Sequence, residues 1–358
     1  MNELEAILAT TEALLQIDSP TGSEQVLGDW LEARVREFAP HACIRARNSL
    51  CVVPQALRED RALVMLLGHT DTVPKLGPNP VRREGDRLYG LGASDMKAAL
   101  AVMLALAERA RQVPPRHDLA LVFYGGEEGA YAESEMPAIH AAARTCFDRT
   151  RFAICLEPTD NQIQLGCMGT AHAELTFRGR RAHSARPWQG ENAIHKAAPL
   201  LARLAARKPI EHRIAGLVFT EVVSATLAEA KGARNVIPDR FWLNLNYRFA
   251  PGKDEAQVRR DLAELAGAEA ELELTDYSPA GRVCADNPLL QELRAAAGNP
   301  LVCAKQAWTD VGRLSWMGID AINFGPGATA QAHQAGEWIS IREIERHWQA
   351  LLTWLYGG

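Results

Sequence analysis

The sequence predicts an α/β protein: a mixed, largely parallel sheet covered by helices, interrupted by a smaller inserted α+β domain. Three short apolar runs, Ala62–Gly68, Leu119–Tyr124 and Phe152–Leu156, have the composition of buried strands. An alanine-rich helical stretch from about Lys97 to Ala110 lies between the first two. Strands that alternate with helices are typical of a parallel sheet with helices on both faces.

The pattern changes near Gly169. Strand-like and helical segments then follow in the order strand, helix, strand, strand, helix, strand, at Ala171–Phe177, Ile194–Ala206, Leu217–Thr226, Phe241–Phe249, Asp254–Leu265 and Glu271–Tyr277. This is the order of a ferredoxin-like α/β sandwich. Because the alternating strands leave one sheet face or edge exposed, this domain is a candidate dimer contact.

The helical and buried-strand pattern resumes near Asp286, and Ala321–Phe324 is the last expected strand. We therefore expect residues 1–168 and 284–358 to form a catalytic domain and residues 169–283 to form the inserted one. At the N-terminus, apolar residues at helical spacing and the absence of a basic cluster predict an amphipathic helix, not a signal peptide.

Composition excludes several classes of protein. The chain has 358 residues, is 47% hydrophobic and carries a net charge of -5 without runs of like charge, which argues against a nucleic-acid-binding protein. No apolar stretch is long enough to cross a membrane. The seven cysteines are scattered and none has C-x-x-C spacing, so we expect reduced thiols and a cytoplasmic location.

Imidazoles and carboxylates stand at the ends of the apolar runs or on turns: His69, Asp71, Asp95, Glu127, Glu128, Glu157 and His333. Because functional residues of such sheets collect past the carboxyl ends of the strands, we expect them in one crevice. Two imidazoles and three carboxylates suit a pair of borderline divalent ions, with one carboxylate left to act as a base. The set predicts a two-metal hydrolase.

Each motif has a simpler explanation when it is taken alone. In HTDTV, His69 can bind a metal while Asp71 accepts the second ring N–H, but the motif also suits a polar loop. In GASDMKAAL, Asp95 either caps the following helix or offers both oxygens to two cations. In GGEEG, the adjacent carboxylates Glu127 and Glu128 repel each other unless cations neutralise them. One should bind metal and one should act as base, and spacing does not decide which.

The two remaining candidates are weak signals by themselves. Glu157 directly follows an apolar strand and precedes Pro158, which is a good position for a ligand. His333 follows the GPG turn at residues 325–327, where a lone histidine is usually just exposed to solvent. His172 and His195 fall within regular elements of the inserted domain, and we expect them to be structural.

Together the motifs HTDTV, GASDMK, GGEEG, LEPTD and FGPG…AH resemble, in order, those of the M20 family of metallopeptidases and deacylases, over nearly the whole chain. The resemblance implies a zinc-peptidase-like catalytic domain with an inserted dimerisation domain, and hence a homodimer. It implies two divalent ions, most often zinc, with cobalt or manganese as substitutes. The implied ligands are His69 and Glu157 on one ion, Glu128 and His333 on the other, and Asp95 bridging both.

The resemblance also implies roles for three further side chains. Glu127 is the implied general base, and Asp71 is implied to orient the metal ligand His69 without contacting the metal itself. His183, in RGRRAHSARP, matches a histidine that reaches the active site of the partner subunit and stabilises the oxyanion there. Without the resemblance, His183 would be taken for an exposed loop residue.

Within the family, residues 87–108, 169–199, 235–251 and 308–327 resemble the succinyl-diaminopimelate desuccinylases, particularly those of actinobacteria. This implies an N-acyl amino acid substrate, N-succinyl-L,L-diaminopimelate, with Asn235 and Arg248 on its carboxylates and Thr309 in contact with it. One position departs from the pattern. Many relatives have an arginine just before Gly169, where this chain has Met168, and a replacement could come from Arg178, Arg180 or Arg186.

Two alternatives stay open from the sequence. Another M20 activity, such as an N-acetylornithine or N-acyl-amino-acid deacylase or a dipeptidase, would use the same metals with different pocket contacts. A non-catalytic binding protein with this fold would have lost a ligand or the base, and none is lost here.

Overall fold

The computed structural model describes residues 2–357, which divide into two compact units. The first contains the chain up to Gly166, Cys284–Cys303 and the chain from Thr309 onwards. The second contains Cys167–Val283 and the short segment Ala304–Trp308, which the sequence pattern does not separate from its surroundings.

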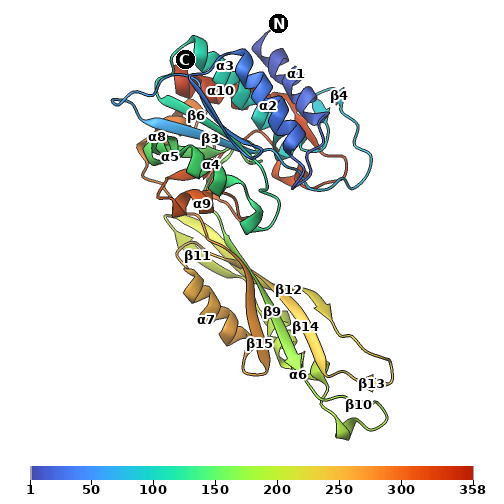
Figure 1. Ribbon diagram of the computed structural model, residues 1–358. Coiled ribbons are helices and arrows are strands. Elements are labelled where there is room, and N and C mark those ends of the chain that lie inside the picture. The colour runs from blue at the N-terminus through green and yellow to red at the C-terminus, as the bar shows by residue number, and fades with distance from the viewer. Residues whose placement is uncertain (1, 358) are drawn as a thin grey trace. The chain divides into compact units, whose positions relative to one another are not determined.

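An eight-stranded sheet forms the centre of the first unit (Figure 1). In order across the sheet, its strands are β1 (Ala42–Ala46), β2 (Ser49–Val53), β6 (Asp118–Tyr124), β3 (Leu63–His69), β7 (Thr150–Cys155), β17 (Ala321–Asn323), β8 (Ile163–Leu165) and β16 (Val302–Ala304). Strand β3 is parallel to β6 and β7, and β17 is parallel to β7. The pairs β1–β2, β2–β6 and β17–β8 are antiparallel. The prediction of an α/β fold with a mixed, largely parallel sheet is confirmed.

Helices cover the sheet of the first unit. They are α1 (Glu3–Leu15), α2 (Gln25–Glu37), α3 (Ala98–Gln112), α4 (Met136–Ala142), α5 (Arg144–Arg149), α8 (Pro288–Ala296), α9 (Val311–Trp316) and α10 (Ile341–Tyr356). Figure 1 shows α1, α2 and α3 on one side of the sheet and α4 and α5 on the other. The alanine-rich α3 packs on β3 and β6. The approach is so close that a Cβ at Gly68 would lie 2.5 Å from the side chain of Leu100.

A small antiparallel sheet joins distant parts of the first unit. Its strands are β18 (Trp338–Ser340), β5 (Arg87–Tyr89) and β4 (Arg82–Glu84). Strand β18 pairs with β5, so the C-terminal segment lies beside the residues that lead into the turn η1 (Ala93–Lys97). The local sequence pattern predicts none of these three strands.

The second unit is an antiparallel sheet with helices α6 (Ala193–Ala206) and α7 (Glu255–Ala266) packed on it. Its strand order is β11 (Ile210–Ile214), β12 (Leu217–Glu229), β14 (Arg240–Phe249), β9 (Gly169–Arg178) and β15 (Ala270–Ser278). The expected strand–helix order is present, with β11 added at one edge. A two-stranded pair, β10 (Ala182–His183) and β13 (Val236–Ile237), was not expected.

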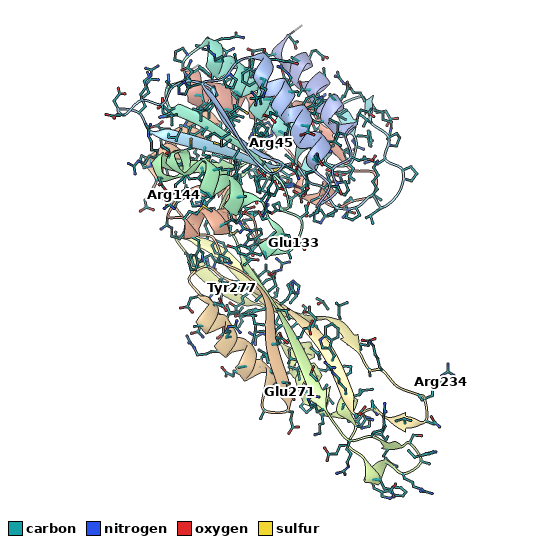
Figure 2. All side chains as sticks on the ribbon, in the orientation of Figure 1. Arg45, Glu133, Arg144, Arg234, Glu271 and Tyr277 are labelled. Atoms are coloured by element: carbon teal, nitrogen blue, oxygen red, sulfur yellow. The ribbon has the colours of Figure 1, made fainter. Side chains whose placement is uncertain are left out.

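The core of the second unit follows the alternation of its strands. Residues at every second position of β9 and β14 are buried against α6 and α7, among them Leu175, Phe177 and Leu243. Tyr277, near the end of β15 (Figure 2), stacks on Phe249 with ring centroids 5.7 Å apart. Within residues 2–357, no helix has the length and apolar character needed to span a membrane.

Candidate metal centre

His69 is placed by a fully buried strand of the first unit. It is the last residue of β3, every residue of which is buried, and its imidazole is 1% exposed. Its Nδ1 lies 3.0 Å from the main-chain oxygen of Asp71. Since a carbonyl oxygen only accepts, Nδ1 carries the proton in this contact. The Nε2 atom then faces Asp95, with 3.1 Å to Oδ1.

The carboxylate of Asp71 contacts a different element from the one the sequence suggests. Its Oδ1 is 3.7 Å from His69 Nδ1, too far for a hydrogen bond. Instead, Oδ1 accepts the main-chain N–H of Glu127 at 3.1 Å, and Oδ2 accepts that of Glu128 at 3.0 Å. Thr21 donates its hydroxyl to Oδ2 at 3.0 Å. Asp71 therefore orients His69 through its carbonyl and holds the GGEEG turn through its fully buried carboxylate.

Asp95 lies on the irregular turn η1, just before α3. It does not cap that helix, because the N-cap residue is Lys97, which makes no capping side-chain bond. Its Oδ1 is 3.1 Å from His69 Nε2 and its Oδ2 is 3.7 Å from His333 Nε2. The two oxygens of one carboxylate thus face two imidazoles from segments far apart in the chain.

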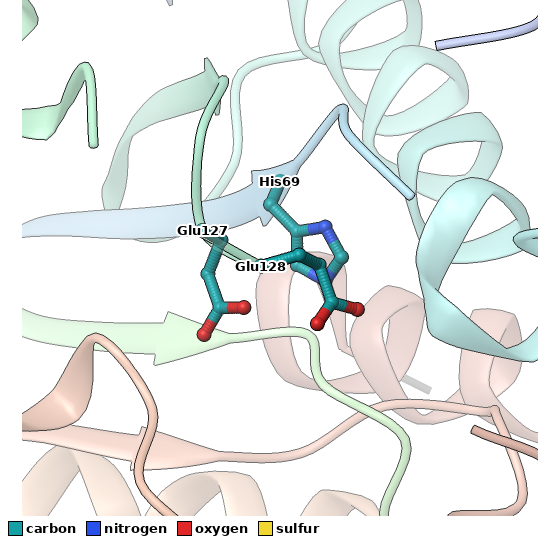
Figure 3. Close-up of side chains that lie close together, drawn as sticks. All are labelled: His69, Glu127 and Glu128. Carbon is teal, nitrogen blue, oxygen red and sulfur yellow. The ribbon is translucent and has the colours of Figure 1, made fainter. Parts of the chain in front are cut away.

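The turn after β6 carries Glu127 and Glu128. Figure 3 shows both carboxylates projecting to the same side as the imidazole of His69, and one potential ligand atom from each of the three lies within 4.8 Å of the others. Burial raises the pKa of Glu127 well above its ordinary value, and the charge of Glu157 adds to this. Glu128 Oε1 is 2.8 Å from His333 Nε2.

Two further groups of potential ligand atoms lie within 4.8 Å: His69 with Asp95 and Glu157, and Asp95 with Glu128 and His333. Asp95 belongs to both. Glu157 is buried beyond the end of β7, whereas the side chain of His333 is half exposed. Two imidazoles and four carboxylates thus converge in one place in the first unit.

The electrostatics of this cluster suit cations. Burial would lower the pKa of His69, but its hydrogen bond to Asp95 and the charges of Asp95, Glu127 and Asp71 raise it well above its ordinary value. The hydrogen bond to Glu128 likewise raises the pKa of His333. A site that draws protons onto both histidines has the negative potential that a pair of divalent cations would neutralise. The donors, imidazole nitrogen and carboxylate oxygen, are those that zinc binds.

The remaining candidates lie mostly in the second unit. His183 is exposed on β10, and its Nδ1 accepts the main-chain N–H of Ala185 at 3.1 Å. The carbonyl of the exposed Asn235 accepts the N–H of Ser184 at 2.9 Å, so Asn235 lies beside His183. Arg248 is on β14, where its Nε donates to Asn246 Oδ1 at 3.1 Å, and burial lowers its pKa. Thr309 is in the first unit and is buried.

Met168, where many relatives are expected to have arginine, is fully buried. It packs in a small apolar cluster with Phe219 and Ala250, so it presents no surface to a ligand. Of the expected replacements, Arg178 is 2.6 Å from Glu271 and Arg180 is 3.6 Å from Glu191. Arg186 is exposed in the segment that follows β10.

Sequence reasoning missed Glu337. This carboxylate is 1% exposed and accepts three main-chain N–H groups from residues 92–95. It lies only four residues after His333, but nothing in the local pattern distinguishes it from a surface glutamate. Its partners are more than 240 residues away in the chain.

The family model of peptidase family M20/M25/M40 matches residues 65–356. The chain belongs to this family. The resemblance stated from the motifs is thereby confirmed.

Curated relatives in this family cover nearly the full chain. A Mycobacterium tuberculosis protein with the provisional name succinyl-diaminopimelate desuccinylase is 38% identical, over 97% of each chain. The succinyl-diaminopimelate desuccinylase of Corynebacterium glutamicum is 36% identical, over 94% of this chain and 92% of its own.

Solved structures share the fold at low identity. A tripeptidase from Staphylococcus aureus has a TM-score of 0.80 and 19% identity, and the match covers 99% of this chain and 98% of the tripeptidase. A protein from Bacillus subtilis described as a dinuclear metal binding peptidase of the M20 family has a TM-score of 0.71 and 15% identity, covering 98% and 97%. At this identity the likeness shows the M20 fold alone.

Proposed function

We propose that this protein is a dinuclear metal amidohydrolase that converts N-succinyl-L,L-diaminopimelate and water to succinate and L,L-diaminopimelate, on the route to lysine and cell-wall peptide. The observation that carries the proposal is identity of 36–38% to succinyl-diaminopimelate desuccinylases over more than nine-tenths of the chain. The cluster of two imidazoles and four carboxylates supports the metal-dependent chemistry.

The proposed ligands follow from the groups in the cluster. His69 and Glu157 would hold one cation, Glu128 and His333 the other, and Asp95 would serve both. Zinc is the metal we propose, with cobalt or manganese as substitutes. When bound, the two cations supply Lewis acidity, which polarises the amide carbonyl and makes water more acidic.

Glu127 is the proposed general base, because it is the one carboxylate of the cluster that belongs to neither of the two potential ligand groups that contain Asp95. It would take a proton from the attacking water and return it to the departing amine nitrogen. A positioned base of this kind contributes roughly 100- to 10,000-fold to the rate.

His183 is the proposed oxyanion donor, acting on the active site of a partner subunit. Its Nδ1 accepts the N–H of Ala185, so the ring can keep its proton on Nε2 and donate it. Asn235 and Arg248 would bind substrate carboxylates, and Thr309 would contact the substrate. The dimer would form through the second unit. The seven free cysteines support a reducing, cytoplasmic location.

Mixing two inactive variants tests the role of His183 in the partner subunit. Glu127→Gln and His183→Ala would each lose activity, about 100- to 1,000-fold for His183→Ala. Subunits exchanged between the two variants would form mixed dimers in which one active site has both residues. Recovery of activity after mixing supports the proposal, whereas no recovery in proven mixed dimers contradicts it.

A substrate panel tests the reaction itself. Zinc-loaded protein would be assayed with N-succinyl-L,L-diaminopimelate, N-acetylornithine, N-acetyl amino acids and dipeptides. A strong preference for the succinyl compound in kcat/KM is expected, although Met168 is buried and cannot replace the arginine of other relatives. Preference for another amide would refute the substrate and leave the metal chemistry in place.

A further inference from the structure

Glu337 makes an unusual set of contacts for a glutamate outside the proposed ligands. Its Oε1 accepts the main-chain N–H of Ser94 at 2.7 Å and that of Asp95 at 2.9 Å. Its Oε2 accepts the N–H of Gly92 at 2.7 Å. Both oxygens are therefore used within one turn, and the side chain is almost fully buried.

The backbone of Glu337 is itself fixed. Its carbonyl accepts the N–H of Gly90 at 3.1 Å and the side-chain amide of Asn79 at 3.2 Å. The next residue, Trp338, pairs with Tyr89 between β18 and β5, and its carbonyl accepts the hydroxyl of Ser94 at 2.9 Å. The carboxylate is thus held by regular structure and does not depend on a mobile loop.

The turn that Glu337 contacts cannot satisfy these N–H groups by itself. Gly92 is left-handed, with a φ of 84°, and Asp95 has a φ of -126° and a ψ of 86°, so neither continues a helix. Three buried main-chain donors therefore need acceptors from elsewhere. Within residues 2–357, Gly92 makes one main-chain hydrogen bond inside the turn, in which its carbonyl accepts the N–H of Lys97 at 2.7 Å.

We propose that Glu337 is a positioning residue for the metal centre: it fixes the turn so that the two oxygens of Asp95 face both cation positions. It also links that turn to the segment that contains His333, which lies four residues before Glu337. The inference rests on the proposed two-metal site, because Asp95 is placed there as the shared ligand. Glu337 itself is in none of the three groups of potential ligand atoms.

Replacing Glu337 by glutamine tests this role. A glutamine keeps one oxygen but turns an NH₂ group toward a main-chain N–H, so at least one of the three bonds is lost. Residues that orient metal ligands typically change metal affinity by about 10- to 100-fold when they are replaced. We expect Glu337→Gln to weaken the binding of at least one zinc ion by that factor. Glu337→Asp, which keeps the charge, should recover part of the loss.

Asp86→Asn provides a control in the same small sheet. Asp86 accepts the hydroxyl of Ser340 at 2.7 Å and the N–H of Arg342 at 3.1 Å, next to β18 but away from the ligands. Zinc dissociation constants would be measured by competition with a chelator, and zinc content by elemental analysis. Thermal unfolding of each metal-free protein would report on folding. Asp86→Asn should bind two zinc ions with unchanged affinity.

The outcomes separate this inference from the proposed function. Unchanged zinc affinities in a folded Glu337→Gln protein would overturn the positioning role while leaving the two-metal site intact. Equal losses in Glu337→Gln and Asp86→Asn would also overturn it, because general loosening of the small sheet would then be the cause. Failure of the unmodified protein to bind two zinc ions would instead overturn the metal centre itself.

Discussion

The carboxylate of Asp71 should act on one of the two cation positions and not on the other. It accepts the N–H groups of Glu127 and Glu128, whereas its nearer oxygen is 3.7 Å from the imidazole of His69. Asp71→Asn should therefore disturb the turn that carries Glu128 and leave His69, which is held by the main-chain carbonyl of residue 71, in place. A role through the imidazole would give the opposite result.

The size of the effect follows from the bonds that are lost. If the amide oxygen of asparagine takes the place of Oδ2, the bonds from Glu128 and Thr21 survive and only the bond from Glu127 is lost. One bond to a charged acceptor is worth about 2 kcal/mol. At 1.4 kcal/mol per factor of ten, displacement of the turn should weaken the binding of the cation proposed to be held by Glu128 roughly 30-fold.

The assay uses a protein with one cation position removed. His333→Ala should keep the position formed by His69, Asp95 and Glu157. The zinc dissociation constant of this variant would be measured with and without Asp71→Asn. We expect the two values to agree. If Asp71→Asn lowered the zinc affinity of the His333→Ala protein by about 10- to 100-fold, the reasoning would be refuted, because Asp71 would then act through His69.

Three further side chains should each change activity or stability when they are replaced. Glu127→Gln should lower kcat by at least about 100-fold while zinc content, measured by elemental analysis, is unchanged; a near-normal rate would contradict its role as base. Burial lowers the pKa of His347 to about 3, from about 6.5 when unfolded, so the unfolded chain binds more protons between these values and stability falls as pH drops from 6.5 toward 3. Between pH 6.5 and 4, the free energy of unfolding, measured with urea, should fall by about 3 kcal/mol more in the native protein than in the His347→Gln variant. Equal decreases in the two proteins would refute this. Lys97 Nζ donates to the carbonyls of Leu14 and Ile17, so Lys97→Met should cost about 1–3 kcal/mol in the same assay, and an unchanged midpoint would show that water replaces the bonds.

The physical basis of the His347 prediction lies in its two ring nitrogens. Nδ1 is 2.9 Å from the side-chain oxygen of Asn161, whose amide nitrogen already donates to Glu343. Nδ1 therefore carries the proton, and Nε2 is buried without a hydrogen-bond partner among residues 2–357. A second proton on Nε2 would be a buried charge with no acceptor, which explains why the neutral ring is favoured.

The sequence predicts the parts of the fold that local patterns determine. The apolar runs that predict β3, β6 and β7 end within two residues of the observed strands, because a fully buried strand needs continuous apolar sequence. Charged residues directly after such runs, His69 and Glu157 among them, stand out because burial of a charge needs a reason. The motif chemistry therefore pointed to residues that the structure brings together.

The parts that the sequence does not predict depend on contacts between distant segments. Glu337 and the turn at residues 92–95 meet because β18 pairs with β5, and three-residue strands leave no recognisable period. Two of the donors to the Asp71 carboxylate are main-chain N–H groups, which every residue except proline has and no motif records. A sequence pattern therefore identifies ligand types more readily than the groups that hold them.

Both Asp71 and Glu337 hold turns that carry proposed metal ligands by accepting main-chain N–H groups, and this arrangement has a consequence for the cation-free protein. Glu127, Glu128 and Asp95 repel one another, and mobile turns would separate them to relieve that repulsion. Buried carboxylates bonded to the backbone prevent this separation, so the negative potential stays in place until cations arrive. Cations that bind only the folded state stabilise it by mass action, by about 2.7 kcal/mol at 100 times the dissociation constant. Because the turns are rigid, the proposed ligands stay close together. They therefore repel one another in the metal-free protein and bind cations more tightly when metal is present.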